Sequence, residues 1–211
     1  MTNRKIDVPI DIHPDVVQGD HSALTVPRRA FGTLHAGWMA LKEAALRVKD
    51  TDKLAKEART LTSRVVASLR REHDTCLAAC KQLSEKIDAA IMSNPHDQMG
   101  GEIRAYIRGT GNPFKAATDA ALEGNRRMVA AVLNAPAQLS GLAHEQYNTV
   151  HEVARDRLEH VDHSALKQLQ SLAHKLDTYT NRFEKLATER IAAWETGDDD
   201  FLKKVFSTND G

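Results

Sequence analysis

The chain of 211 residues has few of the features that mark specialised classes of protein. It contains only two cysteines, too few for a disulfide-bonded scaffold, so we expect a reducing compartment. Aromatic residues make up 5%, which is low for a β-sandwich and typical of packed helices built on Leu, Ala and Ile. Lys plus Arg and Asp plus Glu both number 29, so no net charge draws the chain to nucleic acid or to an anionic membrane.

Long apolar runs are also absent. The longest stretch without Asp, Glu, Lys, Arg or His is Met128–Ala143, and it contains Asn134, Pro136 and Gly141, so we expect no transmembrane helix. The N-terminal sequence MTNRKIDVP has no unbroken apolar core, so we expect no secretory signal. Apolar residues at 41% and charged residues at 27% are the proportions of a folded globular protein.

Glycine and proline are missing from two long stretches, 38–94 and 142–196, and are concentrated between them. Because these residues interrupt helices, the pattern predicts an all-α fold: an elongated helical bundle with long helical arms at 27–94 and 142–196 around a short-helix middle at 95–141. We expect residues 27–196 to form a single domain. An extended N-terminal arm at 1–26 precedes it, and a C-terminal tail with a short helix at 197–211 follows it.

Short polar side chains that cap helices predict interruptions within both arms, at 50–52 and near 160–164. In the middle segment the same reasoning predicts three short helices. The first covers 98–108 and ends at Gly109, the second opens at Asn112 and closes at Gly124, and the third is capped by Asn125 and covers 126–134.

The second arm repeats apolar residues with a period of seven, which predicts a narrow seam that packs on a partner helix, as in a coiled coil. Asp162 and Arg190 interrupt this seam. The seam residues that we expect to bind a partner are Leu169, Leu172, Leu176, Tyr179, Phe183 and Leu186.

The N-terminal arm alternates apolar and polar residues, with Ile6, Val8, Ile10 and Ile12 on one side. Pro9 excludes a central strand, so the pattern indicates an edge strand or an extended arm. Two interpretations stay open: the four aliphatic side chains pack along the chain's own helices, or they bind a neighbouring subunit or partner.

The sequence contains no constellation typical of catalysis. His73, Cys76 and Cys80 share a helix face but extend an apolar stripe, which favours core packing over zinc binding. The glycine-rich run at 109–112 lacks the Lys-Ser/Thr ending of a phosphate-binding loop, and no serine lies in a Gly-x-Ser-x-Gly motif. We therefore expect no enzyme, no cofactor and no metal site. A metal-dependent His/Cys helical protein is the weaker alternative, since the chain has ten histidines.

One segment resembles a protein family. The residues that carry the resemblance are Glu102–Ala105, Ala116–Asn125 and the run from Val129 to Leu142, with Tyr147 and His151 after them. Over residues 102–151 the chain resembles uncharacterised proteins encoded by tailed bacteriophages and prophages of proteobacteria. The resemblance implies a phage genome and a role in the particle or its assembly, and the family has no activity that could be carried over to this chain.

The leading hypothesis is a non-enzymatic bacteriophage virion or assembly protein, associated with the portal or neck, the interior or the head. It would be located in the virion after assembly in the host cytoplasm. Its partners would be other virion proteins or further copies of itself in a homo-oligomer, bound through helix–helix and arm contacts, with neither membrane nor nucleic acid. The alternative is a cytoplasmic helical adaptor or regulator that binds a single protein partner.

Overall fold

The computed structural model describes residues 6, 8–48, 50–92 and 97–196. In this part of the chain the fold is all-α, with seven α-helices, four short 3-10 helices and no strand, which confirms the predicted fold class. The α-helices are α1 (Thr25–Arg47), α2 (Thr51–Ile91), α3 (Gly100–Gly109), α4 (Pro113–Leu122), α5 (Arg126–Leu133), α6 (His144–Leu158) and α7 (His160–Thr196). The predicted C-terminal helix within 197–211 lies outside the described residues.

The chain forms two compact units. Unit 1 comprises residues 1–78 and 169–211, and unit 2 comprises 79–168. The single domain expected over 27–196 stays a prediction. The helices α2 and α7 each contribute one part to unit 1 and another to unit 2, and neither has a glycine or proline where it passes from one unit to the other.

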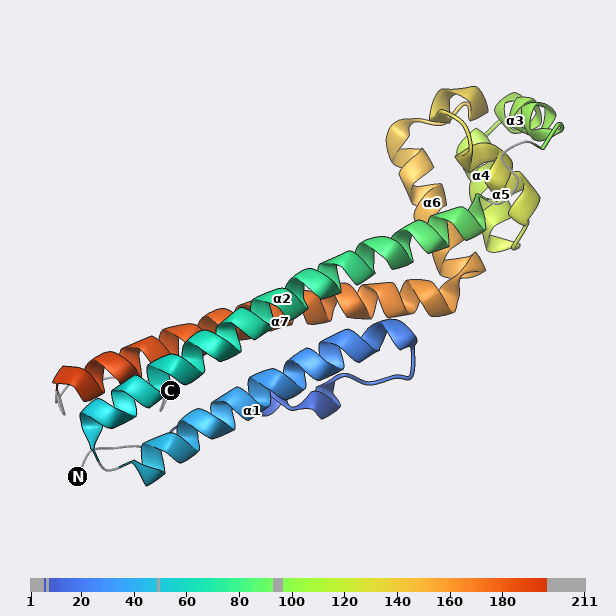
Figure 1. Cartoon of the computed structure of the whole chain (residues 1–211). Helices are drawn as coiled ribbons and strands as arrows, with labels where there is room; N and C mark the ends of the chain where they lie inside the picture. Colours follow the sequence, from blue (N-terminus) through green and yellow to red (C-terminus); the bar gives the residue numbers. More distant parts are fainter. Residues whose placement is uncertain (1–5, 7, 49, 93–96, 197–211) are drawn as a thin grey trace, which may run out of the picture. The chain divides into compact units, whose positions relative to one another are not determined.

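In unit 1, α1 lies beside the first part of α2 and the last part of α7 (Figure 1). The rings of Trp38 and Phe183, from α1 and α7, are 5.5 Å apart at their centroids. Ion pairs Arg29–Glu72 at 2.6 Å and Arg47–Glu57 at 2.6 Å link α1 to α2. Each large apolar side chain that leaves water here stabilises the unit by about 1.5–3 kcal/mol. The largest fully buried ones are Ile6, Ile12, Leu24, Phe31, Leu34, Trp38, Leu41, Leu54, Leu69, Phe183 and Trp194.

The N-terminal segment folds against α1 as three 3-10 turns, Ile10–Ile12, Pro14–Val16 and Ser22–Leu24, rather than as the expected edge strand or extended arm. Prolines 9 and 14 cannot donate to a β-ladder. The side chain of His13 accepts a hydrogen bond from the Asp15 backbone N–H, and that of His21 accepts one from Ala23. These caps stabilise turns at positions where an alternating pattern indicated extended backbone.

Three of the predicted helix starts have the caps that the sequence indicated. Asp50 accepts a hydrogen bond from the Lys53 N–H at the start of α2, and in unit 2 Asn112 and Asn125 accept from the third residues of α4 and α5. Gly124 closes α4 with a φ of 75°, in the left-handed region that favours glycine. The α6–α7 break falls at Glu159, one residue before the predicted range.

Candidate interaction surface and polar network

Unit 1 has a groove of about 900 Å³ along α2 and α7, which we call the α2–α7 groove. It lies on a different side of the two helices from α1. Val65 approaches Gly37 of α1 and Phe183 contacts Trp38, whereas the next residues, Val66 and Glu184, line the groove. The groove is lined by Arg59, Thr62, Ser63, Val66, Ala67, Arg70, Arg71, Glu184, Thr188, Ile191, Ala192 and Glu195.

Small side chains leave the centre of this groove open. Ser63 and Ala67 on α2 and Thr188 and Ala192 on α7 are each four residues apart, so each pair occupies one face of its helix, and all four are exposed. Val66 and Ile191 lie beneath them, each only 6% exposed. The arrangement is a shallow apolar depression of the kind into which an amphipathic helix packs.

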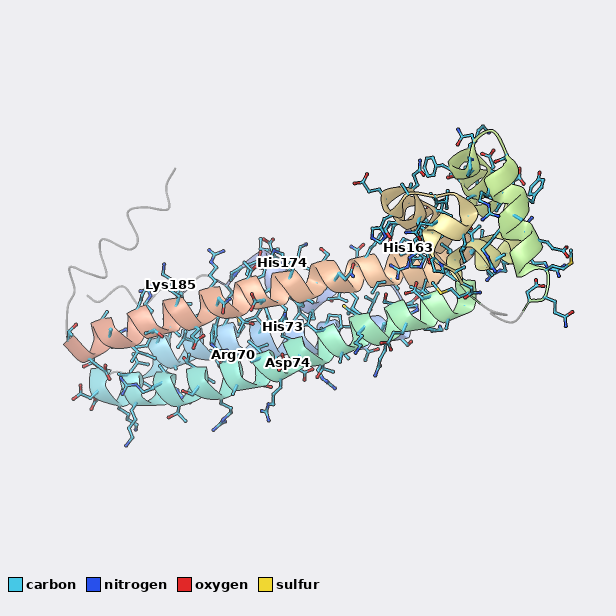
Figure 2. The ribbon with its side chains drawn as sticks, turned by 90° about the horizontal axis from the view of Figure 1, so that it is seen from above. Arg70, His73, Asp74, His163, His174 and Lys185 are labelled. Carbon is cyan, nitrogen blue, oxygen red and sulfur yellow. The ribbon has the colours of Figure 1, made fainter. Side chains whose placement is uncertain are left out.

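Ion pairs between α2 and α7 bound the α2–α7 groove at both ends. Arg59 pairs with Glu195 at one end, and Arg70 pairs with Glu184 at 2.7 Å at the other. Arg70 extends from α2, as Figure 2 shows. All four side chains are at least 40% exposed, so these contacts add little stability and remain available to other charged groups.

A buried hydroxyl lies in the lining of the α2–α7 groove. Thr62 is 7% exposed, and its Oγ1 has no hydrogen-bond partner within the described part of the chain. Other helical threonines of this fold, such as Thr180 and Thr188, donate to the carbonyl oxygen four residues earlier. Because a buried hydroxyl without a partner costs about 1–3 kcal/mol, Thr62 is a polar group that a bound molecule could satisfy.

The predicted seam faces the interior of unit 1. Four of its members, Leu169, Leu172, Leu176 and Phe183, are at most 4% exposed, and Tyr179 and Leu186 are half-buried. The chain's own helices cover this seam. The seven-residue repeat therefore identified α7 as a packing helix. It did not indicate the groove residues, because most of them are small or polar.

The four aliphatic residues of the N-terminal arm have different environments. Ile6 is 1% exposed and Ile12 is fully buried, whereas Ile10 is 88% exposed and Val8 is half-buried. The hydroxyl of Tyr179 on α7 donates to the Asp11 carboxylate at 2.8 Å, and this bond raises the pKa of Tyr179. Within the described residues, the arm packs along the chain's own helices, which is one of the two interpretations of the sequence.

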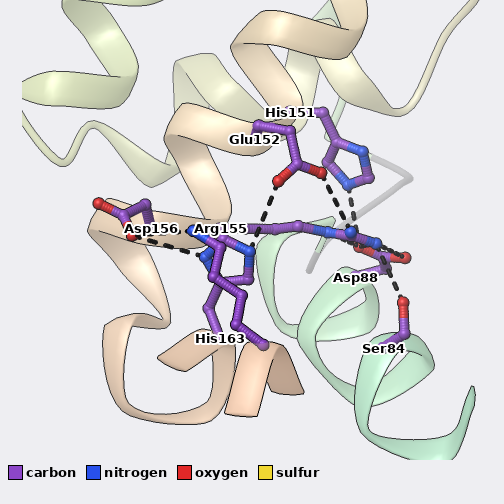
Figure 3. Close-up of polar contacts among 8 residues, drawn as sticks. Ser84, Asp88, His151, Glu152, Arg155, Asp156 and His163 are labelled. Atoms are coloured by element: carbon purple, nitrogen blue, oxygen red, sulfur yellow. Dashed lines mark hydrogen bonds and ion pairs between the residues drawn. The ribbon is translucent and has the colours of Figure 1, made fainter. Parts of the chain in front are cut away.

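Unit 2 contains a polar network centred on Asp88 of α2 (Figure 3). The guanidinium of Arg155 on α6 donates to both Asp88 oxygens, at 2.7 Å and 2.7 Å, and to Ser84 Oγ at 3.1 Å. The Nε2 atom of His151 lies 2.9 Å from Asp88 Oδ1. Arg155 and His151 are 15% and 18% exposed, so this is a largely desolvated Arg–Asp–His cluster that fixes α6 on α2.

His163 on α7 extends the network toward the α6–α7 break (Figure 3). It is 3% exposed, with Glu152 Oε2 3.5 Å from its Nε2 and Asp156 Oδ1 3.6 Å from its Nδ1. Burial lowers the pKa of His163, an effect that the nearby Lys167 supports and that Glu152 and Asp156 oppose. The folded unit therefore favours the neutral imidazole.

Among the described residues, no group of three or more His, Cys, Asp or Glu side chains could hold a metal ion. Cys76 is fully buried and Cys80 is half-buried, and burial raises the pKa of the Cys80 thiol. Figure 2 shows His73 and Asp74 on α2 and His174 and Lys185 on α7.

No helix within the described ranges is long and apolar enough to cross a membrane. The chain matches no protein-family model, and neither a curated protein nor a solved structure matches it.

Proposed function

We propose that this chain is a non-enzymatic virion or assembly protein of a tailed bacteriophage and that it acts by binding other proteins through its helix surfaces. The observation that carries the proposal is the α2–α7 groove. In it, small exposed side chains cover an apolar floor at Val66 and Ile191, on a side of the helix pair that α1 leaves open. The family resemblance over residues 102–151 supplies the phage context.

A partner helix would fit the α2–α7 groove for a geometric reason. Helices approach to about 8–10 Å when small side chains lie at the contact, and the groove has Ser63 and Ala67 on one wall and Thr188 and Ala192 on the other. The arginines on the α2 side and the glutamates on the α7 side would orient a helix with acidic residues along one edge and basic residues along the other. The buried seam of α7 is already used inside unit 1, so the groove replaces it as the proposed partner-binding surface.

Sedimentation velocity of the full chain over a range of concentrations tests the proposal. We expect an oligomer larger than a dimer, or a stable complex with a co-purified structural protein of the phage that encodes the chain. The variant Ala192→Glu, which places a charge in the groove, should weaken this association. Ala36→Glu, at an exposed alanine of α1 outside the groove, should not.

The outcome also separates the two functional hypotheses. A chain that stays monomeric or dimeric and forms a stoichiometric complex with one non-virion protein would favour the adaptor. A monomer that binds none of the phage structural proteins, or an association that Ala192→Glu leaves intact, would overturn the proposed use of the groove.

A further inference from the structure

We propose that the α2–α7 groove binds the same groove of a second copy of this chain, in a dimer whose two-fold axis is parallel to α2 and α7. The inference names a partner for the groove and so rests on the proposed function. A contact between two identical surfaces requires a surface that is complementary to itself. The groove meets this requirement, because arginines line its α2 side and glutamates line its α7 side.

The two ion pairs that bound the α2–α7 groove give the register of the helices. Arg59, in the first part of α2, pairs with Glu195 near the end of α7. Arg70, farther along α2, pairs with Glu184, which comes earlier on α7. The two helices are therefore antiparallel, and each of these arginines lies at the same level along the groove as one glutamate.

A two-fold axis parallel to the helices places α2 of each copy over α7 of the other and leaves the level along the groove unchanged. Arg59 of each copy then lies over Glu195 of the other copy, and Arg70 lies over Glu184. At each end of the groove, four side chains of alternating charge would surround the axis, two from each copy. Each arginine would keep the glutamate of its own chain and gain a second one.

A two-fold axis perpendicular to the helices gives the opposite result. It places α2 over α2 and α7 over α7 with their directions reversed. Arg59 of one copy would then lie over Arg70 of the other, and Glu195 would lie over Glu184. Arg71, which also lines the groove, would add a further positive charge to the arginine side. Like charges that face each other across an interface oppose association, so the charges favour the parallel axis.

The small side chains of the groove agree with the same arrangement. By the register of the ion pairs, Ser63 lies near the level of Ala192, and Ala67 lies near the level of Thr188. With the parallel axis, small residues of one copy therefore meet small residues of the other, which permits helix axes about 8–10 Å apart. The apolar floors of the two grooves would form the centre of a four-helix arrangement.

Reversal of the charges on each side of the groove tests the proposal. One variant combines Glu184→Lys with Glu195→Lys, and the other combines Arg59→Glu with Arg70→Glu. By sedimentation velocity we expect the unaltered chain to form a dimer, as the smallest unit of any larger assembly. The dissociation constant of the dimer should rise at least about tenfold for each variant alone. An equimolar mixture of the two variants should dimerise again, because each copy then faces opposite charges.

A matched variant controls for the change in net charge. Glu43→Lys with Glu57→Lys adds the same charge and removes the exposed Arg47–Glu57 ion pair, at residues that do not line the groove. It should dimerise like the unaltered chain, and circular dichroism should show equal helical content in all variants. A chain that is monomeric at every concentration, a dimer that both groove variants retain, or a mixture that stays monomeric would overturn the proposal.

Disulfide formation between copies tests the direction of the axis. Ser63→Cys and Ala192→Cys are made in separate chains, so that a disulfide between the new thiols joins two copies. Their mixture should give a covalent dimer, and peptide mass spectrometry distinguishes its linkage from any that involves Cys76 or Cys80. A mixture of Ser63→Cys with Ala67→Cys should give none. A covalent dimer from this second mixture would overturn the parallel axis.

The same measurements separate this inference from the proposed function. A monomeric chain whose complex with a phage structural protein is weakened by Ala192→Glu would overturn the dimer and leave the proposed function in place. A groove-dependent dimer that neither assembles further nor binds a phage structural protein would confirm the inference and overturn the proposed function.

Discussion

Gly37 on α1 and Val65 on α2 are so close that a Cβ atom on the glycine would lie 2.8 Å from Val65 Cγ1. Side-chain atoms do not approach to this distance without displacement. The absence of a side chain at position 37 therefore sets the separation of α1 and α2 in unit 1, and it aligns Trp38 with Phe183 one residue farther on.

Gly37→Ala should destabilise the protein by about 1–3 kcal/mol, because the overpacking at Val65 outweighs the gain of about 0.5–1 kcal/mol for alanine over glycine in a helix. Gly32→Ala in the same helix is the control. A Cβ there meets nothing within 4 Å, so this change should stabilise by up to about 1 kcal/mol. Urea unfolding measures the free energy of unfolding of both variants. Changes of the same sign in the two variants would contradict the close approach of Gly37 to Val65.

Ile12→Ala should cost about 2–5 kcal/mol in the free energy of unfolding, because Ile12 is fully buried and the change leaves a cavity. Ile10→Ala, two residues earlier at 88% exposure, should change the stability by less than about 0.5 kcal/mol. Thermal unfolding of both variants compares them. Similar small effects would mean that the arm packs against something other than its own chain.

Asp88→Ala should destabilise unit 2 by about 2–3 kcal/mol, because it leaves the partly buried guanidinium of Arg155 without its carboxylate. The exposed pair Lys115–Asp119 in the same unit provides the comparison, and Asp119→Ala should cost less than about 1 kcal/mol. Chemical unfolding followed by circular dichroism gives both values. An equal cost would show that the network contributes no more than a surface ion pair.

Stability should fall as the pH is lowered from 7 toward 5, in part because of His163. Burial lowers its pKa in the folded chain, so the unfolded chain, with a histidine pKa near 6.5, binds the proton first. The contribution of neutral His163 to the stability is complete above about pH 6.5. It is lost as the pH falls toward the lowered pKa of His163 in the folded chain. His163→Gln should flatten the dependence of the melting temperature on pH, and His174→Gln, at an exposed position, should leave it unchanged.

Much of the fold could be predicted because single residues decide where helices begin and end. Asp50, Asn112 and Asn125 are caps in the structure as in the sequence, and Gly124 ends α4 where a left-handed residue is required. The arm was harder to predict. Alternation of Ile6, Val8, Ile10 and Ile12 indicated extended backbone, but the histidine-capped 3-10 turns bury only some of these side chains.

The candidate site could be predicted only in part, for reasons of composition. The seam residues were recognised because Leu and Phe repeat every seven residues, and the structure uses them inside unit 1. The α2–α7 groove depends on Ala67 and Ala192, because these small side chains leave its centre open. The pairing of Asp88 with Arg155 joins residues far apart in the sequence, and no local spacing indicates it.

The connectivity of the two units has a consequence for synthesis on the ribosome. Unit 2 is one continuous stretch, 79–168, whereas unit 1 needs residues from both sides of that stretch. At about 5–20 residues per second, the N-terminal part of unit 1 waits several seconds for the C-terminal part of α7. During that time the apolar faces of α1 and α2 have no α7 to cover them, so unit 2 should complete its fold first and the nascent chain should be most sensitive to aggregation just before α7 emerges.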